Sequence, residues 1–590
     1  MLSYRKLAMR VLGRPLHTGG GIDSPRPASQ RAAALVLTAA MLTTFTAPAF
    51  AKTWYIEDGD ITISASETKG TNKVSQGAEP EVEDTGTIIT NREKDASSHT
   101  VTINAGNDKV EVTLDNVNIK ADSGSALISK GDVTLTLKGD NHLTGGNGGS
   151  SSYGGDGITS SGSLTISGGT VTATGGDSTS SVGSGGSGIY SVSGDVTISG
   201  GTVNANGGDG KNGSGGGSGI DSSGGVTVSG GTVTANGGDS KDGDGGSGGY
   251  GISSSGVAIS GGTVTANGGD GGSGSGSHGG NGIYSSGGVT ISSGSTVTAN
   301  GGDGEDGSGG RGITSNGGVT VSGGTVNAKG GSGKNGNGGD GIRSFNPVAI
   351  SGGTVNANGG NSDYSNGGDG IRSLDHVAIS GGTVKSNGGS GNLSGGNGII
   401  SYDIDLSGSL ELTAKAGSPN GKALSRVGRE LDLDTIKDKL GPGAKVTATD
   451  ANGETKQVSI PRPVEPEGPV IPEESSSSSG GGSAAPSAPV SSLPGLTVTD
   501  KDGQRISYTS TQSGNTLTVC VGRLTASLHV SLAALRQLRA EGIETITFQT
   551  VLCSTTLSVD ELLAMGGEDA EIVLTHHIRS STLTVGGKAV

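Results

Sequence analysis

Short runs in which apolar and polar residues alternate fill the middle of the chain. In the unit Gly219–Asp239, the runs Val226-Thr227-Val228 and Val233-Thr234-Ala235 are separated by Ser/Gly corners. A period of two places successive side chains on opposite faces of a β-strand, so each run predicts a strand with one buried face. Glycine at the corners supplies backbone conformations that β-branched residues do not adopt.

A Gly-Ile step opens each unit and recurs at intervals of 28 to 32 residues. Its isoleucines are Ile158, Ile189, Ile220, Ile252, Ile283, Ile313, Ile342, Ile371 and Ile399. Hairpins would reverse the pattern between neighbouring strands, whereas here it recurs in one direction, so like strands stack in parallel. We predict an all-β fold, a parallel β-helix over residues 100–415, with inward residues such as Ile189, Val196, Ile198, Val203 and Ala205. Nine coils would span roughly 40 Å at the ~4.8 Å spacing of strands.

The flanking segments differ from the repeat in composition. Solenoids need polar, atypical ends, so we assign residues 52–99 as the N-terminal cap and 416–460 as the C-terminal cap. Residues 461–494, rich in Pro, Ser and Gly, are predicted to be a linker. Residues 495–590 contain strand-like runs and a helix capped by Ser531 that ends near Ala540, which indicates a small α+β domain.

Residues 1–51 have the pattern of a signal peptide. Basic residues precede an apolar run from Ala32 to Phe45, and Ala49-Phe50-Ala51 is a small-residue cleavage site. The apolar run is shorter than the ~20 residues of a membrane span. We therefore expect a secreted protein, extracellular or associated with a cell surface, without membrane insertion.

The charge balance bears on partners. The chain has 39 Lys and Arg against 55 Asp and Glu, a formal charge of −16. Residues 1–51 hold six of the basic residues and one acid, so the mature chain has 33 against 54, or −21. Such a charge argues against nucleic acid and anionic membranes as partners.

One outward position carries asparagine in most coils. Its residues are Asn206, Asn236, Asn267, Asn300, Asn358 and Asn387, with Lys329 in one coil. Asparagines stacked in register can hydrogen-bond from amide to amide. We predict a structural ladder here, in preference to a binding site.

A second outward row, the residue after each isoleucine, varies between coils. It contains Tyr190 and Tyr284, which offer flat faces to sugar rings, and Arg343 and Arg372 in adjacent coils. Two like charges so placed repel unless something anionic lies between them. These four residues are candidate ligand-binding residues, although neutral variation on an exposed face would give the same pattern.

The Gly-rich loops carry acids that are candidate calcium ligands. They include Asp209, Asp239, Asp270, Asp303 and Asp306. Carboxylates on flexible turns suit calcium, although Asp-Gly also makes soluble loops and no nonapeptide calcium repeat is present. The coils are nearly interchangeable and none gathers acids and bases, so we expect no enzyme activity. Cys520 and Cys553, in one exported domain, predict a disulfide.

Several motifs resemble a family of exported bacterial carbohydrate-binding proteins first defined in cellulose-degrading clostridia. They are His99–Gly106 (HTVTINAG), Val110–Ile119 (VEVTLDNVNI), Val133–Leu143 (VTLTLKGDNHL) and Ser163–Gly169 (SLTISGG). The resemblance covers about residues 100–415 and implies a right-handed parallel β-helix that binds plant polysaccharides, including acidic ones, with calcium on the fold. The expected function is therefore extracellular polysaccharide binding. The alternative is a structural or adhesive stalk that projects the C-terminal domain.

Overall fold

The structure is a computed structural model. It describes residues 52–149, 153–180, 183–241, 245–274 and 276–461, and then 496–500, 503–506, 508–513, 515–521, 523, 525–550, 554–565, 571–576, 581–585 and 588–589. The chain forms two compact units, Met1–Pro466 and Glu467–Val590. The predicted signal peptide and nearly all of the predicted linker lie outside the described residues.

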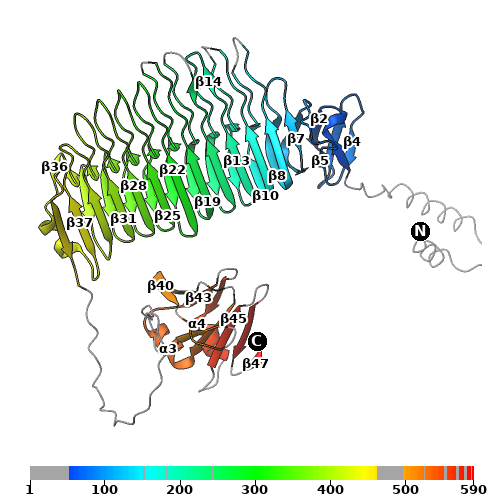
Figure 1. The fold of residues 1–590 in the computed structure, drawn as a ribbon. Helices are drawn as coiled ribbons and strands as arrows, with labels where there is room; N and C mark the ends of the chain where they lie inside the picture. Colours follow the sequence, from blue (N-terminus) through cyan, green and yellow to red (C-terminus); the bar gives the residue numbers. More distant parts are fainter. Residues whose placement is uncertain are drawn as a thin grey trace, which may run out of the picture. The chain divides into compact units, whose positions relative to one another are not determined.

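The first unit is a parallel β-helix, whose strands stack as successive rungs in Figure 1. The residues that open the coils form one continuous ladder of paired positions. They are Ile61, Val101, Leu127, Ile158, Ile189, Ile220, Ile252, Ile283, Ile313, Ile342, Ile371, Ile399 and Leu424. The prediction that like strands stack in one direction is confirmed.

One coil illustrates the packing. Strand β15 (Ile220–Val228) pairs in parallel with β12 (Val196–Ile198) on one side and β18 (Ile252–Ile259) on the other. Strand β16 (Thr232–Asn236) pairs in the same way with β13 (Thr202–Asn206) and β19 (Gly262–Asn267). The predicted inward side chains Ile220, Val226, Val228, Val233 and Ala235 are fully buried. Small and branched residues thus fill a thin core.

Parallel pairing extends past both ends of the predicted 100–415 stretch. At the N-terminal end, β2 (Ile61–Ala65) pairs in parallel with β6 (Val101–Asp115), and β3 (Asn72–Gln76) turns back on β2. At the other end, β37 (Lys445–Thr449) extends the stack in parallel, and β38 (Thr455–Ser459) runs antiparallel to it. Reversed strands at the ends interrupt the repeat that another chain would otherwise extend.

The predicted asparagine ladder is confirmed. The Nδ2 group of Asn236 donates to Asn206 Oδ1 at 2.9 Å, and the next two steps, to Asn267 and Asn300, are each 2.8 Å. Lys329 then interrupts the row, which resumes with Asn387 donating to Asn358 at 2.7 Å. The asparagines therefore bind one another and hold adjacent coils together.

The second unit is the predicted α+β domain, with a core of its own that includes Leu535 and Phe548. One of its sheets consists of β39 (Leu496–Thr499), β42 (Ala526–Ser531), β45 (Glu571–His576), β46 (Ser581–Val585) and β47 (Lys588–Ala589). The other consists of β40 (Thr509–Ser513), β41 (Thr516–Cys520), β43 (Thr545–Gln549) and β44 (Ser554–Ser558). Helix α3 (Leu532–Ala540) leads from the first sheet to the second, and α4 (Val559–Met565) leads back. As predicted, Ser531 caps α3, its hydroxyl accepting from the Ala534 N–H.

Two further sequence expectations concern cysteines and membranes. Cys520 Sγ lies 3.5 Å from Gln549 Oε1, while Cys553 lies outside the described residues. The disulfide therefore stays a prediction. Within the described parts of the chain, no helix is long and apolar enough to span a bilayer.

Candidate ligand-binding face

Two neighbouring rows of side chains form one face of the solenoid. The first row follows each coil-opening isoleucine and aligns Tyr284, Thr314, Arg343 and Arg372. The second row lies two residues before each isoleucine, so one glycine separates it from the isoleucine. The N–H of that glycine donates to the carbonyl of the second-row residue in the next coil, as Gly282 does to Arg311 at 2.9 Å. Five consecutive coils carry one large aromatic or guanidinium group each, and we call this set the tyrosine–arginine stripe: Tyr250, Tyr284, Arg311, Arg343 and Arg372.

The aromatic end of the stripe is a stacked pair. The rings of Tyr250 and Tyr284 lie 5.4 Å apart between centroids with an interplanar angle of 18°. Sequence analysis selected Tyr190 and Tyr284 as candidate binding residues. Asp221 and Ser253 separate these two in the ladder, so the structure does not bring them together. Tyr250 was missed because it precedes the Gly-Ile step. Comparing the residues on both sides of that step would have found it.

The cationic end alternates guanidinium and carboxylate groups. Asp340 Oδ2 lies 3.5 Å from both Arg311 Nε and Arg343 Nη1, and Asp369 Oδ2 lies 3.2 Å from Arg372 Nη1. Arg343 and Arg372 are paired in the ladder, as the sequence predicted. Each of the two guanidinium groups is paired with an aspartate of its own coil, on the row before the isoleucines.

Burial shifts the pKa values of charged groups at this end of the stripe. Desolvation raises the pKa of Asp369, and the nearby Asp340 carboxylate raises it further. Desolvation also lowers the pKa of Arg343, with Arg311 adding to the effect. Three guanidinium groups face two carboxylates here, so the cluster keeps a formal charge of one positive unit inside an acidic molecule.

Three consecutive coils of this face have a buried polar atom without a hydrogen-bond partner among the described residues: Thr314 Oγ1, Arg343 Nε and Arg372 Nε. Thr314 is only 3% exposed. An unsatisfied buried donor costs about 1–3 kcal/mol. One such atom thus lies in each of these three coils, at steps of ~4.8 Å along the row.

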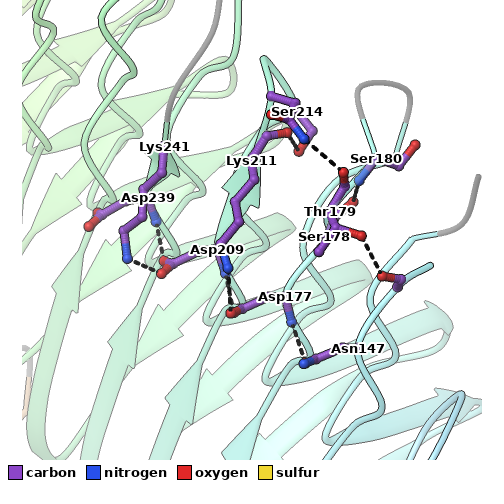
Figure 2. A network of polar contacts seen from close by, with 12 residues as sticks. Asn147, Asp177, Ser178, Thr179, Ser180, Asp209, Lys211, Ser214, Asp239 and Lys241 are labelled. Atoms are coloured by element: carbon purple, nitrogen blue, oxygen red, sulfur yellow. Dashed lines mark hydrogen bonds and ion pairs between the residues drawn. The ribbon is translucent and has the colours of Figure 1, made fainter. Parts of the chain in front are cut away.

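The loop acids form a separate structural ladder (Figure 2). The backbone N–H of Asp209 donates to Asp177 Oδ1 at 3.0 Å, and Asp239 donates to Asp209 in the same way at 3.0 Å. Asp270 and Asp303 continue the row at 2.9 and 2.7 Å. One oxygen of each carboxylate therefore binds the next loop, and the Asp209 Oδ2 atom also pairs with Lys241 Nζ, which raises the pKa of that lysine.

The predicted calcium ligands are thus brought together in part. Asp209, Asp239, Asp270 and Asp303 stand in one row, whereas Asp306 instead accepts a hydrogen bond from Asn335. A shallow pocket of about 290 Å³ lies between the loops and is lined by residues that include Asp270, Asp303, Glu305, Lys334 and Asp363. Across the described ranges, no set of three or more acidic, His or Cys side chains is arranged to hold a metal ion.

Comparison with known proteins identifies the class of fold. A family model described as a β-helix repeat matches residues 164–188, 196–218, 257–281 and 348–371. These segments lie within the regular coils, so the chain contains β-helix repeats. No curated protein and no solved structure matches the chain.

Proposed function

We propose that the protein is an extracellular, non-catalytic polysaccharide-binding protein and that the tyrosine–arginine stripe is its binding face. One observation carries the proposal: five consecutive coils present an aromatic or guanidinium group on the same face. Because coils repeat at ~4.8 Å, such a stripe suits an extended polymer that lies parallel to the solenoid axis.

The chemistry of the two ends supports a sugar polymer with acidic units. Tyrosine rings present flat apolar faces with a polar edge, which suits sugar rings. Guanidinium groups bind carboxylates through charge-assisted hydrogen bonds. The predicted mature chain carries −21, so an acidic polymer is repelled over a Debye length of ~8 Å and needs a local cationic exception. Arg311, Arg343 and Arg372 supply one.

Calcium offers a second route to the same ligand. The loop ladder leaves carboxylate oxygens on each of several coils, and a bound cation there would bridge them to sugar carboxylates. The two modes of binding differ in whether they need calcium. Direct binding by arginine survives a chelator, whereas bridging by calcium does not.

The test uses the full chain and immobilised neutral and acidic plant polysaccharides. We expect Arg343→Ala with Arg372→Ala to abolish binding of acidic polymers, and Tyr250→Ala with Tyr284→Ala to weaken binding of both kinds. Tyr190→Ala is the matched control, because Tyr190 lies in the same ladder three coils from Tyr284. Binding that survives both double variants contradicts the proposal.

The competing function is a stalk that projects the second unit toward a protein receptor. It is favoured by the separate core of residues 496–585 and by the Pro- and Ser-rich composition of the predicted linker. In that case the ligand maps to the second unit, and no stripe variant affects adhesion. Absence of polysaccharide binding by the full chain, with calcium present, would favour this reading.

A further inference from the structure

The chain contains many Asn-Gly steps, a dipeptide that is chemically labile. The backbone nitrogen of the glycine can attack the side-chain Cγ atom of the asparagine, and ammonia leaves as a succinimide ring closes. Glycine favours the attack because it has no side chain in the way. The sixteen steps begin at Asn147, Asn206, Asn212, Asn236, Asn267, Asn281, Asn300, Asn316, Asn335, Asn337, Asn358, Asn366, Asn387, Asn397, Asn420 and Asn452.

Hydrogen bonding protects fifteen of these steps. In each of the fifteen, the N–H of the glycine donates to a backbone carbonyl. In the asparagine ladder, for example, Gly237 donates to the Asn267 carbonyl and Gly268 to the Asn300 carbonyl, each at 2.8 Å. A nitrogen held in this way cannot attack the side chain before it until the bond breaks. The pairing of the coils therefore protects the labile dipeptides.

The exception is Gly213, whose N–H has no acceptor among the described residues. The Ser214 N–H donates to the Lys211 carbonyl at 3.2 Å, and the φ angles of Asn212 and Gly213 are 57° and 86°. Two positive φ angles inside such a bond define a type I′ turn. The bond that closes this turn joins its first and last residues, so the N–H of Gly213 stays outside it. Asn212 is also exposed.

Another loop provides an internal comparison with the same local sequence. Residues 210–213 and 333–336 are both Gly-Lys-Asn-Gly, and Asn335 is exposed like Asn212. Both side-chain amides are bonded, Asn212 to the Thr179 carbonyl at 3.0 Å and Asn335 to Asp306. However, the Gly336 N–H donates to the Gly307 carbonyl at 3.2 Å. The two steps therefore differ in whether the attacking nitrogen is engaged.

We infer that Asn212 is a site of spontaneous deamidation in the folded protein. The Gly213 nitrogen forms a bond to Cγ of Asn212, the Cγ–Nδ2 bond breaks, and the proton of the attacking nitrogen leaves with ammonia. Water then opens the ring at either carbonyl, which yields aspartate or isoaspartate. The reaction needs water alone. It does not depend on the proposed function of the tyrosine–arginine stripe.

The modification changes the contacts of the loop. The Asn212 amide donates to the Thr179 carbonyl of the preceding coil, and an ionised carboxylate has no hydrogen to donate. Lys211, drawn with Thr179 in Figure 2, already lies 3.8 Å from the carboxylate of Asp177. Isoaspartate also adds a methylene group to the main chain of the turn. Deamidation at Asn212 is therefore expected to loosen this loop from the one before it.

The experiment follows deamidation of the full chain during incubation in mildly alkaline buffer. Peptide mapping by mass spectrometry detects the replacement of NH2 by OH at each step, and labelling with an isoaspartyl methyltransferase detects isoaspartate. In the folded chain we expect Asn212 to react at least about fivefold faster than Asn335, which corresponds to one net hydrogen bond of about 1 kcal/mol. In urea, the two should react at similar rates, and the ladder asparagines should react as well.

Asn212→Gln is the control variant, because it keeps an amide but closes a larger ring more slowly. It should remove the isoaspartate signal of this loop. Equal rates at Asn212 and Asn335 in the folded chain would overturn the inference, as would a faster reaction at any of the fifteen protected steps. A preference for Asn212 that persists in urea would also contradict it, since the cause would then be the neighbouring residues and not the fold.

Discussion

The Oδ1 atom of Asp209 accepts a hydrogen bond from the backbone N–H of Asp239 at 3.0 Å, across two successive loops. The same bond joins Asp239 to Asp270 at 2.9 Å. A loop aspartate is therefore both a surface charge and the acceptor that orders the next loop. This double use explains why the Gly-rich loops carry Asp in register, a pattern that solubility alone does not require.

Replacing Asp239 with alanine should loosen the neighbouring loop. The N–H of Asp270 would lose its acceptor, and we expect its amide hydrogen to exchange faster, with a local loss of about 1 kcal/mol. Asp239→Asn keeps an acceptor oxygen and should preserve protection. Hydrogen-exchange mass spectrometry of the loop around Asp270 measures both. Equal protection in the two variants would show that the ladder does not order the loop.

Adjacent residues of one strand should respond oppositely to a charge. Val228 is fully buried, whereas Thr227 is on the outward face of β15. Val228→Asp should cost several kcal/mol of unfolding free energy because it buries a carboxylate among apolar coils. Thr227→Asp should change stability little. Thermal melting and expression yield of the two variants provide the comparison, and similar melting would refute the inward and outward assignment.

Completing the asparagine ladder should stabilise the solenoid. Lys329 stands between Asn300 and Asn358, and the amide bonds stop on either side of it. Lys329→Asn offers two new amide bonds, so we expect a gain of about 1 kcal/mol in unfolding free energy. Lys329→Ala removes the lysine without adding an amide. A gain of equal size in both variants would attribute the effect to the lost charge.

The second unit should become less stable in mild acid. His576 is buried against Phe548 and bonds to Thr550 and Thr555, and its burial lowers the pKa of the imidazole. The unfolded chain binds a proton below pH of about 6.5, while the folded state resists it. The contribution of His576 to the free energy of unfolding is thus fully present above that pH, and it is lost as the pH falls toward the lowered pKa.

Calorimetry of the full chain at pH of about 7.5 and about 5.5 follows this change in the transition of the second unit. His576→Gln should reduce the difference between the two pH values. His529→Gln is the comparison variant, since His529 is half-buried on β42 of the same unit. If His576→Gln retains the full acid sensitivity, another group is responsible.

A disulfide between Cys520 and Cys553 is predicted to add about 3 kcal/mol to the stability of the second unit. Gln549 pairs with both Cys520 and Ser554, so β43 separates the two flanking strands. Two strand steps span ~9.6 Å, beyond the ~7 Å limit between the Cα atoms of a disulfide. Mass spectrometry after alkylation of the native protein decides it, since two labelled thiols would exclude the bond.

The sequence by itself determined the stack, the inward residues and the asparagine ladder. Alternation with a period of two specifies which face of each strand is buried, and a repeat near 30 residues specifies which residues align. Val228 and Ile198 are paired and buried for these reasons. The cap of α3 was also predictable from the local sequence, because the Ser531 hydroxyl bonds to a backbone N–H only three residues later.

Only the tertiary structure decided which side chains meet across coils outside the strands. Tyr250 stacks on Tyr284, and Asp340 pairs with both Arg311 and Arg343, so residues before and after the Gly-Ile step meet across coils. A corner made of glycine has no alternation of apolar and polar residues from which such contacts could be predicted. Periodicity sets register within a repeat, whereas contacts between rows depend on the path of the backbone between strands.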